Sequence, residues 1–284
     1  MARIGVAGLG RMGSSLAVRL AGQGAEVTGW TRSGPSAAAA IGVPAANDLA
    51  GLIQSSDFIV LSLFDDKAVK EVIGALCTQD LTGRLILDTS TVSPALPPSL
   101  APAVEAAGGA LVDAPIAGGP EMVAGGTAGV FIGGSSQEAA HAMPIAELFA
   151  ARVFHVGPLG AGLGMKLANN LMIAGLIATL SDALHVAKRS GLEFETTLKV
   201  IAGGPAGPPF LAARMERILG SDPSVGFPVS GAAKDVQVIS QAAAELGVEV
   251  PVLARAREMI AVCMAEGLSD ADSAAMIRDA WARA

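Results

Sequence analysis

The chain is poor in the side chains on which many catalytic sites are built. Tyrosine is absent from its 284 residues, and there are only three histidines and two cysteines. His141, His155 and His185 are scattered, with no pair at metal-ligand spacing, so the sequence indicates no metal site. Cys77 and Cys263 lie far apart and match no metal or redox motif, which predicts two free thiols. A metal-dependent mechanism therefore has no support.

Two kinds of segment are also missing. No basic run occurs and the formal net charge is −7, which argues against nucleic acid as a partner. The longest apolar stretch, Leu171 to Leu180, is shorter than the roughly 20 residues that a membrane-spanning helix needs. Arg3 is followed at once by a glycine-rich pattern rather than by the apolar segment of an export signal. We therefore expect no membrane partner and a cytoplasmic location.

A glycine pattern lies at the start of the chain, between an apolar run and a helical pattern. Residues 3–7 read as a strand, residues 8–13 read Gly-Leu-Gly-Arg-Met-Gly, and residues 14–20 read as a helix. In a G-x-G-x-x-G turn the first glycine permits the turn, the second lets backbone approach a pyrophosphate, and the third allows close helix–strand packing. The phosphates bind the free N–H groups of the helix N-terminus. We expect a dinucleotide to bind at Gly8, Leu9, Gly10, Arg11 and Met12.

The end of the second predicted strand, residues 26–30, bears on which dinucleotide binds. Sites for NAD carry an acidic residue about 20 residues after the glycines, where it holds the ribose 2′-hydroxyl. Here the strand is followed by Thr31, Arg32 and Ser33, with no carboxylate. A guanidinium between two hydroxyls suits a 2′-phosphate. We therefore expect Thr31 and Arg32 to contact the cofactor, and NADP(H) to be preferred over NAD(H).

The order of apolar runs predicts two domains. Up to about residue 157, short apolar runs alternate with helical segments, which is typical of βαβ units and a parallel sheet. After residues 157–160 only helical patterns follow. We expect strands at 3–7, 26–30, 58–63, 84–88, 110–114, 128–132 and 152–156. We expect helices near 11–23, 37–42, 48–54, 67–76, 94–107, 136–149, 162–190, 194–202, 207–219, 231–246, 250–266 and 271–282. The sequence thus predicts an α/β protein with an N-terminal Rossmann domain, residues 1–160, whose sheet is mostly parallel, and an all-helical C-terminal domain, residues 161–284.

The predicted helix at 162–190 is apolar on nearly every side, which is typical of a helix buried between domains or subunits. Lys166 and Asn170 interrupt it at a spacing of four and so share one face. Burial shifts a lysine toward the pKa range that is useful for proton transfer, although a lysine at a helix start can also be structural. We interpret the pair as catalytic. The apolar surface exceeds what one small helical domain can cover, which predicts a homodimer or homotetramer.

In these features the chain resembles the β-hydroxyacid dehydrogenase family, the relatives of 3-hydroxyisobutyrate dehydrogenase and of the imine reductases. Residues 8–13 resemble the cofactor motif of the family. Residues 113–119, Asp-Ala-Pro-Ile-Ala-Gly-Gly, resemble its substrate-binding motif, and residues 162–170, Gly-Leu-Gly-Met-Lys-Leu-Ala-Asn-Asn, resemble its catalytic motif. Residues 88–94 and 234–235 resemble two further family segments near the nicotinamide. The matches follow the order of the family over residues 1 to about 250.

The resemblance implies roles for individual residues. It makes Lys166 the catalytic lysine and Asn170 its partner. Ser62, Leu63 and Thr91 lie at the carboxyl ends of predicted strands, where open α/β sheets bind ligands. The full expectation is a cofactor site that also includes Ser62, Leu63, Thr91 and Lys234, and a substrate site at Ser90, Ala117, Gly118 and Gly119. The two adjacent glycines would leave backbone N–H groups open to a carboxylate or an oxyanion.

Ala117 departs from the family pattern, which usually carries serine at this position to help anchor the substrate carboxylate. A hydrogen bond to a charged group contributes about 1.5–3 kcal/mol. Its loss puts a simple 3-hydroxy acid in doubt and leaves a ketone, an aldehyde or an imine open as substrate.

The sequence thus predicts an NADP-dependent oxidoreductase that transfers a hydride between nicotinamide and a small β-hydroxy acid or its semialdehyde or keto counterpart. Lys166 would act as general acid and base. Two alternatives stay open. The first is an imine or ketone reductase of the same fold, although relatives with imine activity generally lack this lysine. The second is a non-catalytic NADP-binding sensor, against which the Lys166 and Asn170 pair argues. The sequence names neither the substrate nor the direction of the reaction.

Overall fold

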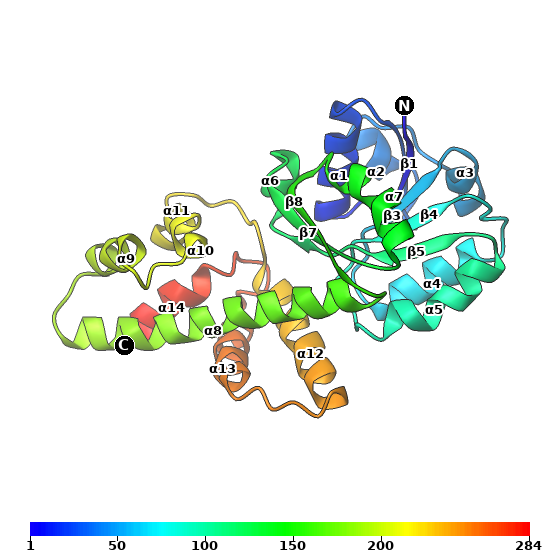
Figure 1. The fold of residues 1–284 in the computed structure, drawn as a ribbon. Coiled ribbons are helices and arrows are strands. Elements are labelled where there is room, and N and C mark those ends of the chain that lie inside the picture. The colour runs from blue at the N-terminus through cyan, green and yellow to red at the C-terminus, as the bar shows by residue number, and fades with distance from the viewer. The chain divides into compact units, whose positions relative to one another are not determined.

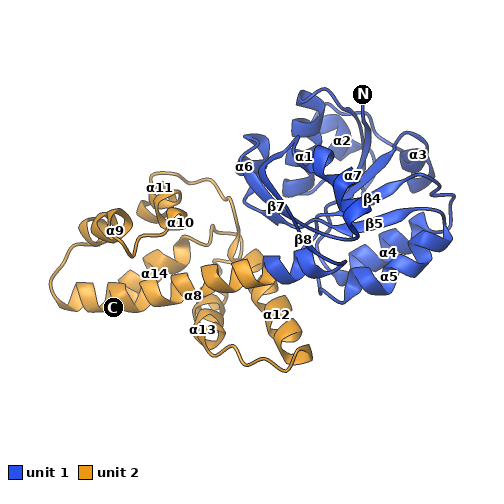
Figure 2. Cartoon of the chain, viewed as in Figure 1, with its two compact units in different colours: residues 1–166 blue, residues 167–284 orange.

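The computed structural model describes residues 1–284, which form two compact units, residues 1–166 and 167–284 (Figures 1 and 2). Unit 1 contains the whole eight-stranded sheet, and the named elements of unit 2 are all helices. The boundary falls within a single helix, α8 (Ala161–Arg189). The predicted fold class, a Rossmann sheet domain followed by a helical part, is confirmed.

The sheet of unit 1 is mostly parallel. Its strand order is β2-β1-β3-β4-β5-β7-β6, with β8 paired to β7. The strands are β1 (Arg3–Ala7), β2 (Glu26–Trp30), β3 (Phe58–Leu61), β4 (Leu85–Asp88), β5 (Ala110–Asp113), β6 (Ile116–Ala117), β7 (Ala128–Gly133) and β8 (Ala150–Gly157). The first five strands are parallel, and β7 runs antiparallel to β5 and β6. The carboxyl ends of β1, β3, β4 and β5 therefore share one edge, where open α/β sheets bind ligands.

Helices cover both faces of this sheet (Figure 1). The helices of unit 1 are α1 (Arg11–Gly22), α2 (Ser36–Ala40), α3 (Leu49–Gln54), α4 (Asp66–Leu76), α5 (Leu96–Ala106), α6 (Pro120–Ala124) and α7 (Ser136–Ala146). Alternate strand residues face opposite layers: Leu85 and Leu87 of β4 pack in the core cluster of α1 and α7, whereas Ile86 packs in that of α3, α4 and α5. Strands buried on both faces explain why the sequence shows continuous apolar runs there.

Two short elements of unit 1 were not predicted. Strand β6 and helix α6 fall in residues 116–124, which the sequence analysis left without structure. Gly118 has φ +149, a conformation that favours glycine, and Pro120 occupies the first helical position after it. The strand before this glycine turn and the helix after it are each too short to show a periodic pattern, so neither was predicted.

The helices of unit 2 beyond α8 are α9 (Phe194–Gly203), α10 (Pro209–Ala212), α11 (Met215–Leu219), α12 (Val229–Glu245), α13 (Val252–Ala265) and α14 (Ala275–Arg283). The single helix predicted at 207–219 is wrong, because it is divided into α10 and α11 at Ala213 and Arg214. Arg214 donates to Asp272 Oδ1 at 3.1 Å and to Ser273 Oγ at 3.3 Å. The residue at which the helix is interrupted is thus held by hydrogen bonds to a distant segment.

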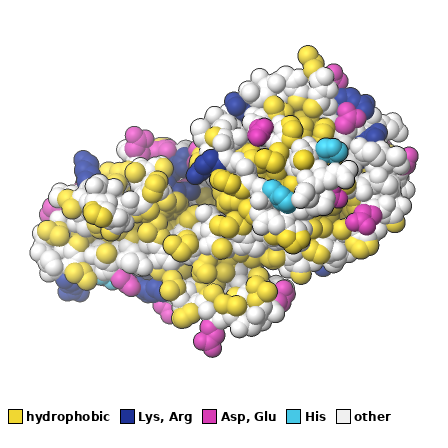
Figure 3. Space-filling model, viewed as in Figure 1, with side chains coloured by type: hydrophobic (Ala, Val, Ile, Leu, Met, Phe, Trp, Pro, Cys, Tyr) yellow, Lys and Arg dark blue, Asp and Glu magenta, His cyan; other side chains and the backbone are white.

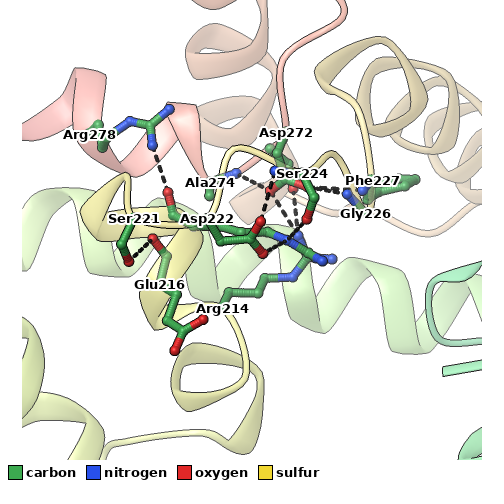
Figure 4. Close-up of polar contacts among 12 residues, drawn as sticks. Arg214, Glu216, Ser221, Asp222, Ser224, Gly226, Phe227, Asp272, Ala274 and Arg278 are labelled. Carbon is green, nitrogen blue, oxygen red and sulfur yellow. Dashed lines mark hydrogen bonds and ion pairs between the residues drawn. The ribbon is translucent and has the colours of Figure 1, made fainter. Parts of the chain in front are cut away.

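Asp272 is a buried hub that joins three segments of unit 2 (Figure 4). Its Oδ2 accepts the N–H groups of Gly226 and Phe227 at 2.9 and 3.0 Å, and its Oδ1 accepts the N–H of Ala274 at 2.9 Å. With Arg214, the carboxylate thus holds the α10–α11 joint, the loop before α12 and the start of α14. All of these partners are internal, which indicates a structural role.

Helix α8 is the longest apolar element. By length and composition the whole of α8 could cross a membrane. The continuous apolar stretch considered in the sequence, from Leu171 to Leu180, is by itself too short for this. Core helices of soluble proteins share this length and composition, so the helix alone does not indicate a membrane protein. Apolar side chains also reach the surface of unit 2 (Figure 3). Met172, Val186 and Val200 are among the exposed large apolar residues of this unit.

Candidate active site

Backbone atoms of the protein pack closely around two of the glycines in the turn between β1 and α1. Gly8 has φ +96, and a Cβ there would lie 2.3 Å from the carbonyl oxygen of Ser62. A Cβ on Gly13 would lie 1.8 Å from the carbonyl oxygen of Gly8. The fold therefore requires glycine at both positions, whether or not a ligand binds.

Gly10 is different, because a Cβ at this position would meet no atom within 4 Å. Gly10 is also the N-cap of α1, where no side chain caps the helix and no acidic residue occupies the first turn. The N–H groups of this helix start are thus available to an anion, and the open space at Gly10 admits its approach. These residues fit the pyrophosphate of a dinucleotide.

The neighbours of Gly10 differ in what they can offer. Arg11 is exposed, and Met12 is half-buried against the core. The side chain of Leu9 is buried in the core cluster of α1, which leaves only its backbone for a cofactor. Its carbonyl oxygen accepts a hydrogen bond from Ser14 Oγ at 3.0 Å. Arg11 and Met12 can therefore offer their side chains to a ligand at the turn, whereas Leu9 can offer only its backbone.

Thr31 and Arg32 lie directly after β2. The Thr31 and Ser33 hydroxyls are 3.5 Å apart, and the Arg32 side chain, 83% exposed, places Nη1 at 3.3 Å from Glu71 Oε2 of α4. An exposed ion pair of this kind contributes little to stability. The guanidinium is therefore accessible at the end of β2, with one carboxylate beside it.

Hydrogen bonds join the loop after β3 to the end of β1 and to the loop after β4. Ser62 donates its N–H to the carbonyl oxygen of Ala7, and Leu63 donates its N–H to Ser90 Oγ at 2.9 Å. Ser90 is buried, so its hydroxyl serves this internal contact, whereas Thr91 is half-buried. The structure thus brings Ser62, Leu63, Ser90 and Thr91 to the same sheet edge as the glycine turn.

The residues predicted to bind substrate lie along β6 and the turn after it. Ala117 pairs with Gly129 of β7, and Gly119 is the N-cap of α6 without a side-chain cap. A Cβ on Gly119 would meet the carboxylate oxygens of Glu121 at 2.6 and 2.8 Å. The Glu121 carboxylate therefore lies beside this turn, close to the proposed substrate position, which was not predicted from the sequence.

Two buried carboxyl groups stand side by side at the ends of β4 and β5, where Asp88 and Asp113 are register partners. Burial raises the pKa of Asp88 to about 7, against the hydrogen bonds from Ser90, and the neighbouring Asp113 carboxyl adds to the rise. Oδ2 of Asp88 has no hydrogen-bond partner. Burial also raises the pKa of Asp113, against the backbone N–H groups of Gly160 and Leu163.

Lys166 and Asn170 stand one turn apart on α8, and the Lys166 side chain is buried at 8% exposure. Asn170 Nδ2 donates to Asp235 Oδ2 at 2.8 Å, and Lys234 Nζ lies 3.1 Å from Asp235 Oδ1. One carboxylate thus brings together Asn170 and Lys234, which are far apart in the sequence. Asp235 was not among the predicted site residues, although it follows Lys234 directly and is one of the buried residues of α12.

Comparison with known proteins extends over both units. A family model of the NAD-binding domain of 6-phosphogluconate dehydrogenase matches residues 3–157, and one of the NAD-binding domain of NADP-dependent 3-hydroxyisobutyrate dehydrogenase matches residues 160–280. The 2-hydroxy-3-oxopropionate reductase of Escherichia coli is 30% identical, over 97% of this chain and 96% of the relative. The 3-sulfolactaldehyde reductase of Escherichia coli is 28% identical, over 98% and 95%.

Solved structures agree with this assignment. The 3-hydroxyisobutyrate dehydrogenase of Mycobacterium tuberculosis with L-serine matches at a TM-score of 0.87 and 26% identity, over 98% of this chain and 99% of that one. An imine reductase from Pseudomonas sp. matches at a TM-score of 0.65 and 22% identity, over 98% of both chains, which indicates a common fold. The predicted resemblance and the predicted class of enzyme, an NAD(P)-dependent dehydrogenase or reductase, are both confirmed. The chain belongs to the β-hydroxyacid dehydrogenase family, the oxidoreductases related to 3-hydroxyisobutyrate dehydrogenase.

Proposed function

We propose that the protein is an NADP-dependent oxidoreductase that acts on a small β-hydroxy acid or on its semialdehyde or keto counterpart. The observation that carries this proposal is the buried Lys166, one turn from Asn170, in a chain whose glycine turn leaves Gly10 open to a dinucleotide. The nicotinamide cofactor, when bound, supplies or accepts the hydride. Every other step is assigned to side chains of this chain.

Lys166 exchanges the proton of the reacting oxygen. It takes the hydroxyl proton during oxidation and delivers a proton to the carbonyl oxygen during reduction, which is general acid–base catalysis. Asn170, held by Asp235, orients the substrate or the amine. Lys166 is the candidate because the chain has no tyrosine and no histidine in a recognisable catalytic motif.

The binding roles follow the two sheet-edge loops and the glycine turn. On the cofactor side we assign Gly8, Leu9, Gly10, Arg11, Met12, Thr31, Arg32, Ser62, Leu63, Thr91 and Lys234. On the substrate side we assign Ser90, Ala117, Gly118 and Gly119. The exposed guanidinium of Arg32 at the end of β2, where NAD sites carry an acid, supports the preference for NADP(H).

The relatives support the substrate class. Two of them are named reductases of 2-hydroxy-3-oxopropionate and of 3-sulfolactaldehyde, which are small aldehydes that carry an acidic group. Imine or ketone reduction is the second candidate, since an imine reductase shares the fold and Ala117 lacks the serine hydroxyl that would hold a carboxylate. The lysine at position 166 favours the first candidate. A non-catalytic NADP-binding sensor is the third.

The test compares Lys166→Ala with the wild type on a panel of 2-hydroxy-3-oxopropionate, succinic semialdehyde, 3-hydroxyisobutyrate, uncharged ketones and a cyclic imine. We expect Lys166→Ala to lower kcat by about 10²–10⁴-fold, the usual contribution of general acid–base catalysis. NADPH binding, measured by fluorescence titration, should stay nearly unchanged. Lys166→Arg should rescue little, because a guanidinium does not deprotonate at working pH. Lys199→Ala, which removes an exposed lysine of α9, is the matched control.

Retention of more than about a third of kcat in Lys166→Ala would make the lysine structural, since a general acid or base contributes at least about 100-fold. Turnover of the cyclic imine alone would favour the second candidate. NADPH binding without turnover of any compound would favour the sensor.

We also propose a homodimer or homotetramer in the cytoplasm. The apolar surface of unit 2 supports the oligomer: Met172 of α8 is 76% exposed, and an apolar cavity of about 210 Å³ lies beside Leu180 and Phe210. The two free cysteines, Cys77 and Cys263, suit a reducing compartment. Light scattering at micromolar concentration should give at least twice the chain mass. A mass near 28.3 kDa would contradict the oligomer.

A further inference from the structure

Asp113 lies at the end of β5, in the segment that resembles a substrate-binding motif, yet its carboxylate binds the protein itself. Oδ1 accepts the N–H of Gly160 at 2.6 Å, and Oδ2 accepts the N–H of Leu163 at 2.7 Å. Asp113 is fully buried. Because α8 begins at Ala161, these two donors belong to its N-cap and its third residue, two of the N–H groups that a helix start leaves unpaired. A residue about fifty positions upstream thus caps α8.

The packing around this carboxylate leaves little room for another arrangement. A Cβ on Gly162 would lie 2.3 Å from the carbonyl oxygen of Phe131 and 2.7 Å from Asp113 Oδ2. A Cβ on Gly133 would lie 2.3 Å from Asp113 Oδ1. The two glycines therefore let β5, β7 and the first turn of α8 close on the Asp113 carboxylate.

Lys166 follows Leu163 by three residues, so it stands one helical turn beyond the N–H group that Asp113 holds. A helical turn transmits the position of its first residues to the next turn, because successive N–H groups bond back along the helix. The position of Lys166 along and around the axis of α8 therefore depends on the two N–H groups that Asp113 accepts. Asp113, Gly160, Leu163 and Lys166 all belong to unit 1.

We propose that Asp113 is a positioning residue that fixes Lys166 by holding the first turn of α8. This rests on the proposed function of Lys166. Asp113 accepts hydrogen bonds from the protein with both oxygens and does not bind substrate. Asp113 acts on the reaction only by positioning α8. Its loss therefore changes kcat and leaves the affinity for the cofactor unchanged.

Asp113→Asn tests the proposal, because an amide offers one acceptor oxygen and would turn its NH₂ toward the other N–H donor. We expect kcat, measured with the panel compound that is turned over fastest, to fall by at least about 10-fold, since a displacement of about 1 Å can cost about 100-fold. The KM for that compound and the dissociation constant of NADPH should stay near the wild-type values. In a Lys166→Ala background Asp113→Asn should lower kcat no further.

A second readout does not need turnover. Reductive methylation followed by peptide mass spectrometry measures the accessibility of Lys166 relative to the exposed Lys67 in the same sample. Asp113→Asn should raise the labelling of Lys166 several-fold and leave that of Lys67 unchanged. Unchanged labelling of Lys166 would overturn the proposal, and so would an equal loss of kcat in the Lys166→Ala background.

Three further variants separate positioning from stability. Gly162→Ala should lower kcat and expose Lys166 with the Asp113 carboxylate intact, whereas Gly74→Ala, in α4 of the same unit, whose Cβ would meet no atom within 4 Å, should do neither. Asp48→Ala removes the cap of α3 in the same unit, where Asp48 Oδ1 accepts the N–H of Gly51 at 2.7 Å, and should lower thermal stability without touching kcat. If Lys166→Ala keeps its kcat, the proposed function fails, while the labelling still decides whether Asp113 positions the lysine.

Discussion

Asn170 donates a side-chain N–H to Asp235 at 2.8 Å, so a carboxylate that is only 7% exposed fixes the amide of a proposed catalytic residue. The other oxygen of Asp235 lies 3.1 Å from Lys234 Nζ. The carbonyl oxygen of the Asn170 amide accepts from Asn169 Nδ2 at 3.3 Å. Asp235 therefore determines which end of the amide is directed toward α12, and it does so while it neutralises a lysine assigned to the cofactor.

Asp235→Asn should lower kcat/KM by about 10- to 100-fold, because a hydrogen bond to a charged group contributes about 1.5–3 kcal/mol. The substitution removes the ion pair with Lys234 and allows either orientation of the Asn170 amide. Steady-state kinetics with the preferred panel compound gives the value. Asp182→Asn, an exposed carboxylate of α8 that pairs with Arg255, is the control and should change nothing. Equal effects of the two substitutions would contradict a specific role of Asp235.

Gly10→Ala should separate cofactor binding from folding. A methyl group at this position meets no protein atom, so the melting temperature should stay close to that of the wild type. The same methyl group would fill the space through which a pyrophosphate approaches the start of α1, and NADPH affinity should fall at least about 10-fold, which corresponds to 1.4 kcal/mol. Gly22→Ala, also in open space on α1, is the control. Unchanged NADPH affinity in Gly10→Ala would remove the argument that this glycine serves a ligand.

Arg32→Ala should lower the ratio of kcat/KM for NADPH to that for NADH by at least about 10-fold, because it removes a charge-assisted hydrogen bond to the 2′-phosphate. The exposed position of Arg32 means that stability should not change. Kinetics with both cofactors measures the ratio, and Lys199→Ala controls for the loss of a surface charge. A wild type that prefers NADH, or an unchanged ratio in the variant, would rule out this role.

Ala117→Ser should improve KM for 3-hydroxy acids and change little for uncharged carbonyl compounds. The added hydroxyl lies on β6, beside the turn of Gly118 and Gly119, where it can donate to a substrate carboxylate. Paired kinetics on 3-hydroxyisobutyrate and on a ketone of similar size makes the comparison. If serine leaves the hydroxy-acid kinetics untouched, another group holds the carboxylate or the substrate has none.

Asp88→Asn should change how stability depends on pH. The folded protein raises the pKa of Asp88 to about 7, above the value of about 4 in an unfolded chain. Between these values the folded state binds the proton that the unfolded state has lost, so the contribution of Asp88 to stability falls as pH rises from about 4 to about 7 and stays low above that. An asparagine does not titrate. The melting temperature of the variant relative to the wild type should therefore rise from pH 5 to pH 8, and parallel curves would contradict the shift.

The sequence predicted the elements whose signals are local. Helix α1 after the glycine turn and strand β2 were predicted to within a residue, because glycine punctuation and apolar periodicity act over a few positions. The capping of α8 by Asp113 and the pairing of Asn170 with Asp235 were not predicted, since they join residues 47 to 65 positions apart. Ser90 was predicted to bind substrate, whereas its contact with the N–H of Leu63 was not predicted, because this contact depends on the neighbouring loop. Periodicity therefore indicated the sheet edge at which we propose the site, whereas long-range contacts determine how its side chains are oriented.

The position of α8 has a consequence for recombination among relatives. Loops are normally the tolerated joints between exchanged segments. Here a joint in residues 157–160 would take Asp113 and Leu163 from different parents, and one after α8 would do the same to Asn170 and Asp235. A joint at the boundary of the units would divide Lys166 from Asn170. A single joint between Asp113 and Asp235 keeps all three pairs intact only if it falls between Leu163 and Lys166, inside the helix, where a Cβ on Gly164 would meet no atom within 4 Å.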